Sequence, residues 1–347
     1  MGLATRLAVT GLLAVLVAAT TAQSDRITLG NGTVVADVKV TAFDLSSLKF
    51  TRGGATEQMP SDQVAKLELG AFPAVYRRVL RDPDAMLKVA RERLAAKDLL
   101  LAQFGFVAAA VLFFENDAEG RANGALDEMQ KAMPDAGLLP EVYRLPFEHY
   151  RGRGAKAASE ATEVAKKYVR AAAAGSWPSG FANEAELLLV IAESKDAPSL
   201  QTKLRVVIGK VAGIQAVVAD RAHIELAHSL RESKDVQAAQ RIYEDVRGRV
   251  TADESARAGA MLGLGKILLE TAAAGDRDAG RQAMLCFLRV HLETKGAWPR
   301  LRAEALYHAI LAADKWRGPE FGVVMGRCKR VLVDEFASTE WAVKVQR

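Results

Sequence analysis

The sequence predicts a mainly α protein, an α-solenoid of helical hairpins preceded by a small all-β, barrel-like domain. One observation is a helical register that recurs three times in the second half of the chain: Ala, any three residues, a large apolar residue, a small residue or His, any two, Leu. Half of the 347 residues are hydrophobic but only 6% are aromatic, which favours close-packed helices over a sheet sandwich. Residues 25–69, by contrast, contain short β-branched segments separated by glycines.

The recurring register predicts a stack of helical hairpins. Its copies are Ala222/Leu226/Ala227/Leu230, Ala260/Leu264/Gly265/Leu268 and Ala303/Tyr307/His308/Leu311. After a polar break, the first two copies are followed by a second helix in which an alanine precedes an aromatic residue by four, at Ala239/Tyr243 and Ala283/Phe287. Residues four apart share a helix face, and small ones let a neighbouring helix approach closely. A repeat of roughly 40 residues of this kind is typical of solenoids, whose concave surface binds another protein.

The first 22 residues predict a secretory signal peptide. They contain one charged side chain, Arg6, then an apolar run from Leu7 to Ala19 and small residues before a cleavage site after Ala22. The alternative is a membrane anchor, but the run is shorter than the roughly 20 residues that cross a bilayer. We therefore expect an exported chain, periplasmic or extracellular, with no stable membrane span after cleavage.

Residues 25–69 predict four or five short antiparallel strands. Gly30-Asn31-Gly32 and Gly53-Gly54 supply turns between segments at 25–29, 33–41, 45–51, 56–59 and 63–69. Five such strands can curl into a small barrel.

This part of the chain resembles the small SH3-like barrels near the start of many exported bacterial proteins. The resemblance is carried by Asp25, Ile27, Leu29, Asn31, Gly32, Val35, Pro60, Asp62 and Val64. It implies a fold and carries no catalytic motif.

From residue 71 to 347 the pattern is helical. Asp82 is expected to cap a charged helix to residue 98. The 18 residues from Leu99 to Asn116 are almost all apolar and approach the length of a membrane span, but Gln103 within them, and acids at their far end, favour a buried helix. Further helices are expected at 118–133, 140–152, 155–174, 181–194, 199–212, 215–232, 235–249, 253–273, 277–293, 299–315 and 319–336.

Two segments resemble tetratricopeptide proteins of the bacterial envelope. In Ala222 to Val246 a helix with small residues is joined by a polar turn to a second helix with alanine and an aromatic residue. Residues 331–342, with Phe336 followed by Ala-Ser-Thr-Glu-Trp, look like the closing helix of that family. The resemblance implies a surface that binds other envelope proteins.

No group of residues predicts catalysis, a cofactor or a metal. His223 and His228 lie five apart, about 140° around a helix, whereas metal ligands need a spacing of three or four. Glu148 with His149, and Glu225 with His228, could form acid–base pairs, but such spacings are common on solvated helices. Gly-x-Ser-x-Gly and phosphate-binding loops are missing, and the glycines from 259 to 265 fall inside a helix, where we expect them to be packing contacts. We therefore predict a protein that is not an enzyme.

The charge pattern of the chain argues against one class of binding partner. The formal net charge of +5 becomes +4 when the signal, with one arginine and no acid, is removed, and the basic residues are dispersed among acids. This pattern argues against nucleic-acid binding.

The two cysteines, Cys286 and Cys328, are expected to be buried thiols. The alternative is a disulfide between neighbouring helices.

The candidate partner-binding residues are Trp177, Trp298 and Trp316, each near an interhelix break, and the basic pair Arg151 and Arg153. Large rigid side chains dominate interface energies, and arginines bind anionic groups. The alternatives are that the tryptophans plug gaps between hairpins and that the arginines mark a helix end.

These features favour a non-enzymatic exported scaffold or adaptor that recruits other envelope proteins through its helical repeats. One alternative is a cell-wall or glycan-binding protein that uses the loop tryptophans. Another is an enzyme with a site where the barrel meets the helices, using Asp62, Glu68 or Glu115. The sequence leaves the partner and the oligomeric state open.

Overall fold

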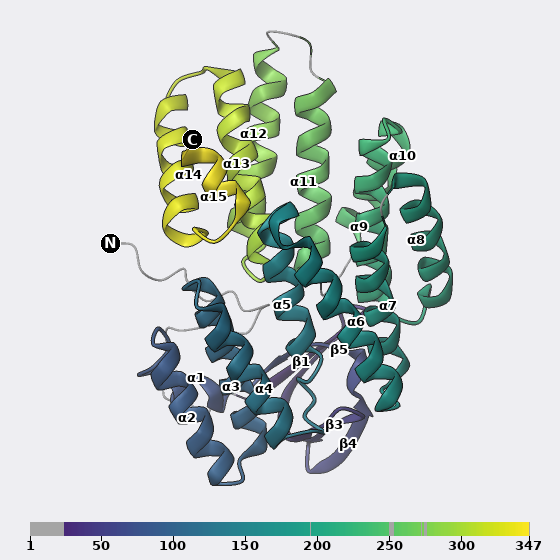
Figure 1. Ribbon diagram of the computed structural model, residues 1–347, viewed down its shortest axis with the longest axis vertical. Helices are drawn as coiled ribbons and strands as arrows, with labels where there is room; N and C mark the ends of the chain where they lie inside the picture. Colours follow the sequence, from purple (N-terminus) through teal and green to yellow (C-terminus); the bar gives the residue numbers. More distant parts are fainter. Residues whose placement is uncertain (1–23, 195, 250–252, 272, 274–275, 347) are drawn as a thin grey trace. The chain divides into compact units, whose positions relative to one another are not determined.

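A computed structural model describes residues 24–194, 196–249, 253–271, 273 and 276–346 (Figure 1). The predicted signal peptide at 1–22 lies outside these residues. The described chain forms fifteen α-helices preceded by five β-strands, so the prediction of a mainly α protein with a small N-terminal β domain is confirmed.

The described residues divide into two compact units. The N-terminal unit contains the chain up to Tyr150 together with Ser159–Leu189, and the C-terminal unit contains Arg151–Ala158 and Val190–Arg347.

In the N-terminal unit the strands form one antiparallel sheet in the order β4-β3-β2-β1-β5. The strands are β1 (Asp25–Leu29), β2 (Val34–Phe43), β3 (Ser47–Arg52), β4 (Ala55–Pro60) and β5 (Val64–Glu68). They lie within two residues of the predicted segments. The sheet is not closed, and β4 and β5 are its two edges, joined in sequence by a 3₁₀ turn at Ser61–Gln63.

The helices of this unit follow the sheet in sequence. They are α1 (Ala71–Tyr76), α2 (Pro83–Ala95), α3 (Leu99–Glu115), α4 (Glu119–Ala132), α5 (Glu141–Gly152), α6 (Ala158–Ala174) and α7 (Ser179–Glu193), with the last residues of α5 and α7 and the first of α6 in the C-terminal unit. As predicted, Asp82 caps α2, because its side chain accepts hydrogen bonds from the backbone N–H groups of Asp84 and Ala85.

The apolar helix α3 is the core of the N-terminal unit. Every residue from Leu101 to Phe114 is buried, which confirms that this segment is a packed interior helix. Gln103 is only 2% exposed, and its amide donates to the carbonyl of Phe43 (3.1 Å) and accepts from the N–H of Leu138 (3.0 Å). Both ends of the amide are therefore satisfied inside the apolar core. In the part of the chain that the structure describes, no helix has the length and apolar character needed to cross a bilayer.

The C-terminal unit is a succession of helical hairpins. Its helices are α8 (Ala197–Val211), α9 (Ala216–Glu232), α10 (Val236–Gly248), α11 (Glu254–Thr271), α12 (Arg277–Glu293), α13 (Pro299–Trp316), α14 (Phe321–Glu335) and α15 (Glu340–Gln346). Each helix from α8 to α15 packs on the next, and α11 also packs on both α9 and α13. Figure 1 shows α11 between these two helices. We call α9, α11 and α13 the inner helices.

Small residues form the seams between the hairpins, as the register predicted. The register alanines Ala222, Ala260 and Ala303 are all completely buried. A Cβ added to Gly265 on α11 would lie 2.6 Å from Cε1 of the buried Phe287 on α12. The expectation that the glycines of this helix are packing contacts is therefore confirmed at this position.

Candidate partner-binding surface

Charged and titratable side chains gather where the three inner helices meet. Positions 300, 304 and 308 share one face of α13, because they are four residues apart. We call this group the inner face and define it by Glu225 and His228 on α9, Lys266 on α11, and Arg300, Glu304 and His308 on α13.

Glu225 is the centre of the inner face. Arg151, at the end of α5, binds it with two parallel hydrogen bonds, from Nη1 to Oε1 (2.8 Å) and from Nη2 to Oε2 (3.1 Å). Arg300 on α13 lies 3.7 Å from the same carboxylate. Burial opposes ionisation of Glu225, but the charges of Arg151 and Arg300 outweigh it and hold its pKa far below its usual range. The carboxylate is therefore ionised and compensated by two guanidinium groups.

The pairing of Glu225 with Arg300 links the two helices that flank α11. Both α9 and α13 pack on α11, and the Arg300 guanidinium lies 3.7 Å from the Glu225 carboxylate. Charged side chains from α9 and α13 therefore meet on one face of the three inner helices.

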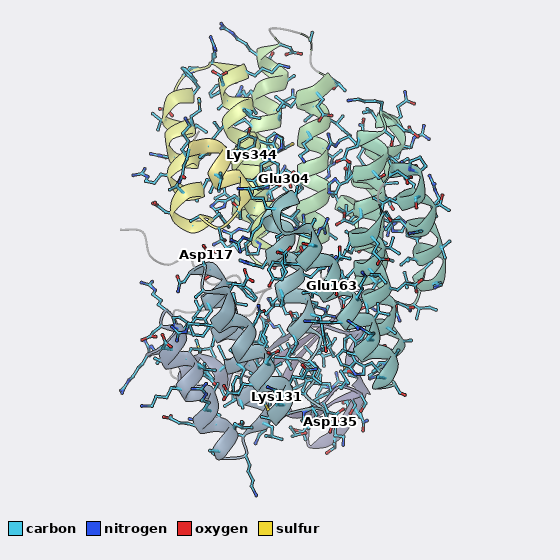
Figure 2. All side chains as sticks on the ribbon, viewed as in Figure 1. Asp117, Lys131, Asp135, Glu163, Glu304 and Lys344 are labelled. Atoms are coloured by element: carbon cyan, nitrogen blue, oxygen red, sulfur yellow. The ribbon has the colours of Figure 1, made fainter. Side chains whose placement is uncertain are left out.

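Other ion pairs join the inner helices in the same way. Lys266 on α11 pairs with Glu304 on α13, and Arg231 on α9 pairs with Glu270 on α11. Burial raises and the Lys266 charge lowers the pKa of Glu304, and the net shift is downward. Burial, together with the charge of Arg151, lowers the pKa of Arg300 to about 10. Glu304 is labelled in Figure 2, on α13, and Lys344, labelled nearby, comes from α15.

The two histidines of the inner face are held neutral. Nδ1 of His228 lies 2.6 Å from the hydroxyl of Tyr243, and the ring of His308 stacks on that of Phe287 with centroids 5.4 Å apart. Burial, with a further contribution from the Lys266 charge, lowers the pKa of both imidazoles to about 4. Glu225 and His228, which the sequence placed one helical turn apart as an acid–base pair, thus have Arg151 and Tyr243 as hydrogen-bond partners instead.

The segment Arg151–Ala158 crosses the inner helices of its own unit. A Cβ at Gly152 would lie 3.3 Å from that of Arg300, and one at Gly154 would lie 2.9 Å from Cδ of Glu340 on α15. Gly154 also has φ +70°, which favours glycine. Arg153 lies in the same segment and is half-buried. Arg151 and Arg153 thus belong to one segment that runs from the end of α5 to the start of α6, and their role in binding a partner stays a prediction.

The two predicted tryptophans of the C-terminal unit pack into their own fold. Trp298 precedes the first residue of α13, is 9% exposed, and its backbone N–H donates to Oγ of Ser255 (3.1 Å). The Trp316 ring lies directly against Gly318, leaving no room for a side chain there. Both placements suit the alternative that these side chains plug gaps between hairpins.

The third predicted tryptophan, Trp177, belongs to an aromatic cluster in the N-terminal unit. Its ring centroid lies 6.1 Å from that of Tyr143, 5.8 Å from that of Tyr168 and 6.3 Å from that of Phe181. Trp177 therefore belongs to a different compact unit from Trp298 and Trp316.

The N-terminal unit holds a buried ion cluster of its own. Arg144 binds Glu184 through Nη2 (2.5 Å to Oε2) and Glu141 through Nη1 (2.9 Å to Oε1), and the Tyr168 hydroxyl donates to Glu184 (2.9 Å). The burial of Arg144 disfavours its charge, but the carboxylates outweigh this effect and raise its pKa. The cluster joins α5, α6 and α7 through the contacts that Arg144 and the Tyr168 hydroxyl make with carboxylates.

Two acids considered for an enzyme site have separate partners. Asp62 accepts a hydrogen bond from the N–H of Gly180 at the start of α7 (2.9 Å), and Glu68 pairs with Lys66 (2.9 Å). Among the residues that are described, no three His, Cys, Asp or Glu side chains come together in a way that could hold a metal ion.

Cys286 and Cys328 are free thiols, and burial raises the pKa of Cys328 to about 11.

Comparison of the chain with protein-family models, with curated proteins and with solved structures gave no match.

Proposed function

We propose that this chain is a non-enzymatic scaffold that binds other proteins through the inner face of its C-terminal unit. The observation that carries the proposal is the meeting of Glu225 on α9 with Arg300 on α13, because it gathers charged side chains from both helices that flank α11 on one face. In stacked helical hairpins, the inner helices form the surface that binds partners.

The finer form of the proposal is a tetratricopeptide-like solenoid with an SH3-like barrel. Support comes from the buried positions of the register residues, Ala222 with Tyr243 and Ala260 with Phe287, at the seams between successive hairpins. For the barrel it comes from the strand order β4-β3-β2-β1-β5 and from the 3₁₀ turn between β4 and β5. The sheet offers a further docking surface.

Export belongs to the same proposal. The apolar run from Leu7 to Ala19 and the small residues before Gln23 support a cleaved signal peptide, so we place the working chain in the periplasm or outside the cell. Its partners are then other envelope proteins.

Site-specific photo-crosslinking in the exporting cells tests the binding face. Leu311 lies eleven residues after Arg300 on α13, which returns to the same helix face, and its side chain is 42% exposed. We expect p-benzoylphenylalanine at Leu311 to capture one or a few envelope proteins. The matched control is Val323 on α14, which is 51% exposed and lies outside the inner helices.

The pattern of crosslinks decides between outcomes. Proteins captured from position 311 and not from 323 would support the inner face as the binding surface. If both positions capture the same proteins to the same extent, or neither captures any, the proposed function is wrong.

A further inference from the structure

We propose that Arg151–Ala158 is an internal ligand of the inner face, and that this face recognises an arginine-bearing, glycine-containing segment of its protein partner through the same contacts. The inference rests on the proposed function and names the chemistry of the partner. The chain's own segment, seated on α9, α13 and α15, is the template for that chemistry.

Glu225 is built to hold a guanidinium group. Both of its oxygens accept hydrogen bonds from Arg151, and the two side chains are only 10% and 20% exposed. A planar guanidinium matches a carboxylate with two parallel bonds, whereas a lysine ammonium offers a single point of charge. The site therefore selects arginine over lysine.

The backbone around Arg151 adds a second requirement. Gly152 lies against Arg300, and Gly154 lies against the carboxylate of Glu340 with φ +70°, so larger residues at these positions would be pushed away from α13 and α15. The whole segment, Arg-Gly-Arg-Gly-Ala-Lys-Ala-Ala, carries three basic residues and no acid. It faces two carboxylates, Glu225 and Glu340.

Arg300 makes the contact exchangeable. Removing one partner from a buried ion pair normally costs about 3–5 kcal/mol, because the remaining charge is left uncompensated. Here Arg300 stays 3.7 Å from Glu225 when Arg151 leaves, so the carboxylate keeps a counter-charge. The inner face can therefore release its own arginine and accept that of another chain.

A labelled peptide copying residues 149–158 tests this exchange with the full-length protein. We expect weak binding to the wild-type chain, because its own segment competes, and binding about 10–100-fold tighter to Arg151→Ala, corresponding to a face occupied by the internal segment 90–99% of the time. Fluorescence anisotropy of the peptide measures both affinities. In the wild-type chain, saturating peptide is expected to speed amide hydrogen exchange in 151–158.

The key contact is tested from both sides. Glu225→Gln in the Arg151→Ala background should abolish binding, with circular dichroism confirming the helices. A peptide with citrulline at the first arginine, which has the same shape without the charge, should bind at least tenfold more weakly and requires no change to the protein. A lysine at that position should also weaken binding.

Either of two results overturns the inference: equal affinity of the peptide for wild type and Arg151→Ala, or equal affinity of the arginine and citrulline peptides for Arg151→Ala. Partners crosslinked at Leu311 together with such a result would leave the scaffold function standing and remove only the internal ligand. Peptide exchange without any crosslinked partner would support the internal ligand and remove the scaffold function.

Discussion

A single methyl group added at Gly265 should test whether the seams between hairpins are as tight as the register requires. The Cβ of an alanine there would lie 2.6 Å from Cε1, 2.9 Å from Cζ and 3.0 Å from Cδ1 of Phe287. Non-bonded carbons prefer about 3.5–4.0 Å, so the ring would have to retreat by about 1 Å. Phe287 is completely buried and His308 stacks on it, so the ring has no free space to enter.

The size of the effect follows from two opposing contributions. Forcing an extra carbon into a packed core costs about 1–3 kcal/mol, while replacing glycine by alanine inside a helix returns about 1 kcal/mol. Gly326→Ala on α14 isolates the second contribution, because no atom lies within 4 Å of its Cβ. We expect Gly326→Ala to stabilise the chain and Gly265→Ala to be less stable than this control by about 1–3 kcal/mol.

Urea unfolding followed by tryptophan fluorescence measures the difference. Trp298, Trp316 and Trp341, three of the four tryptophans, lie in the C-terminal unit, so the signal reports mainly on the helices under test. Phe287→Leu should cost less in the Gly265→Ala background than in the wild type, with a coupling of about 1 kcal/mol or more. If Gly265→Ala proves as stable as Gly326→Ala, the seam is not close-packed and the hairpin register has been misinterpreted.

Three further outcomes are expected. Acidification from pH 6.5 to about 4 should destabilise the C-terminal unit, because His228 and His308 bind protons in the unfolded chain over this range but stay neutral in the folded chain. Urea titrations at several pH values measure how the free energy of unfolding changes with pH, and His308→Asn should make this dependence weaker. Arg144→Met should destabilise the N-terminal unit by about 3–5 kcal/mol by removing the guanidinium that faces the buried Glu184 and Glu141, and Arg144→Met/Glu184→Leu should recover part of that loss, as hydrogen exchange in α5 to α7 can show. Amino-terminal sequencing of the secreted chain should begin at Gln23, and an intact Met1 would contradict export by cleavage.

Local chemistry made the elements predictable. Asp82, Asp98, Asp196, Asp235 and Asp276 each cap the start of a helix with their own side chain, so the helix starts could be placed to within about two residues from these signals. The strands were marked in the same way by glycine turns and β-branched alternation. Both kinds of signal act over a few residues, which is the range that a single sequence reveals.

The inner face was hidden because its contacts are distant in sequence. Arg151 and Glu225 are 74 residues apart, and no local pattern links a basic helix end to an acid in a later hairpin. The spacing of Glu225 and His228 is too common to predict a pair, and the hydrogen-bond partners that the structure gives them, Arg151 and Tyr243, come from another segment and from the next helix. Likewise Trp177 was predicted as a partner anchor from its loop position, and only the structure shows Tyr143 and Tyr168 packed around it.

The charges of the inner face are hard to explain by stability alone. The alanine and glycine seams already pack one hairpin on the next, and buried ion pairs can often be replaced by apolar side chains with no loss of stability. At Glu225, however, the guanidinium groups of Arg151 and Arg300 both approach one carboxylate, and burial with the charge of Arg151 lowers the pKa of Arg300 to about 10. A face that keeps such crowding is better suited to exchanging charged groups than to holding helices together, and this is the property that a binding surface needs.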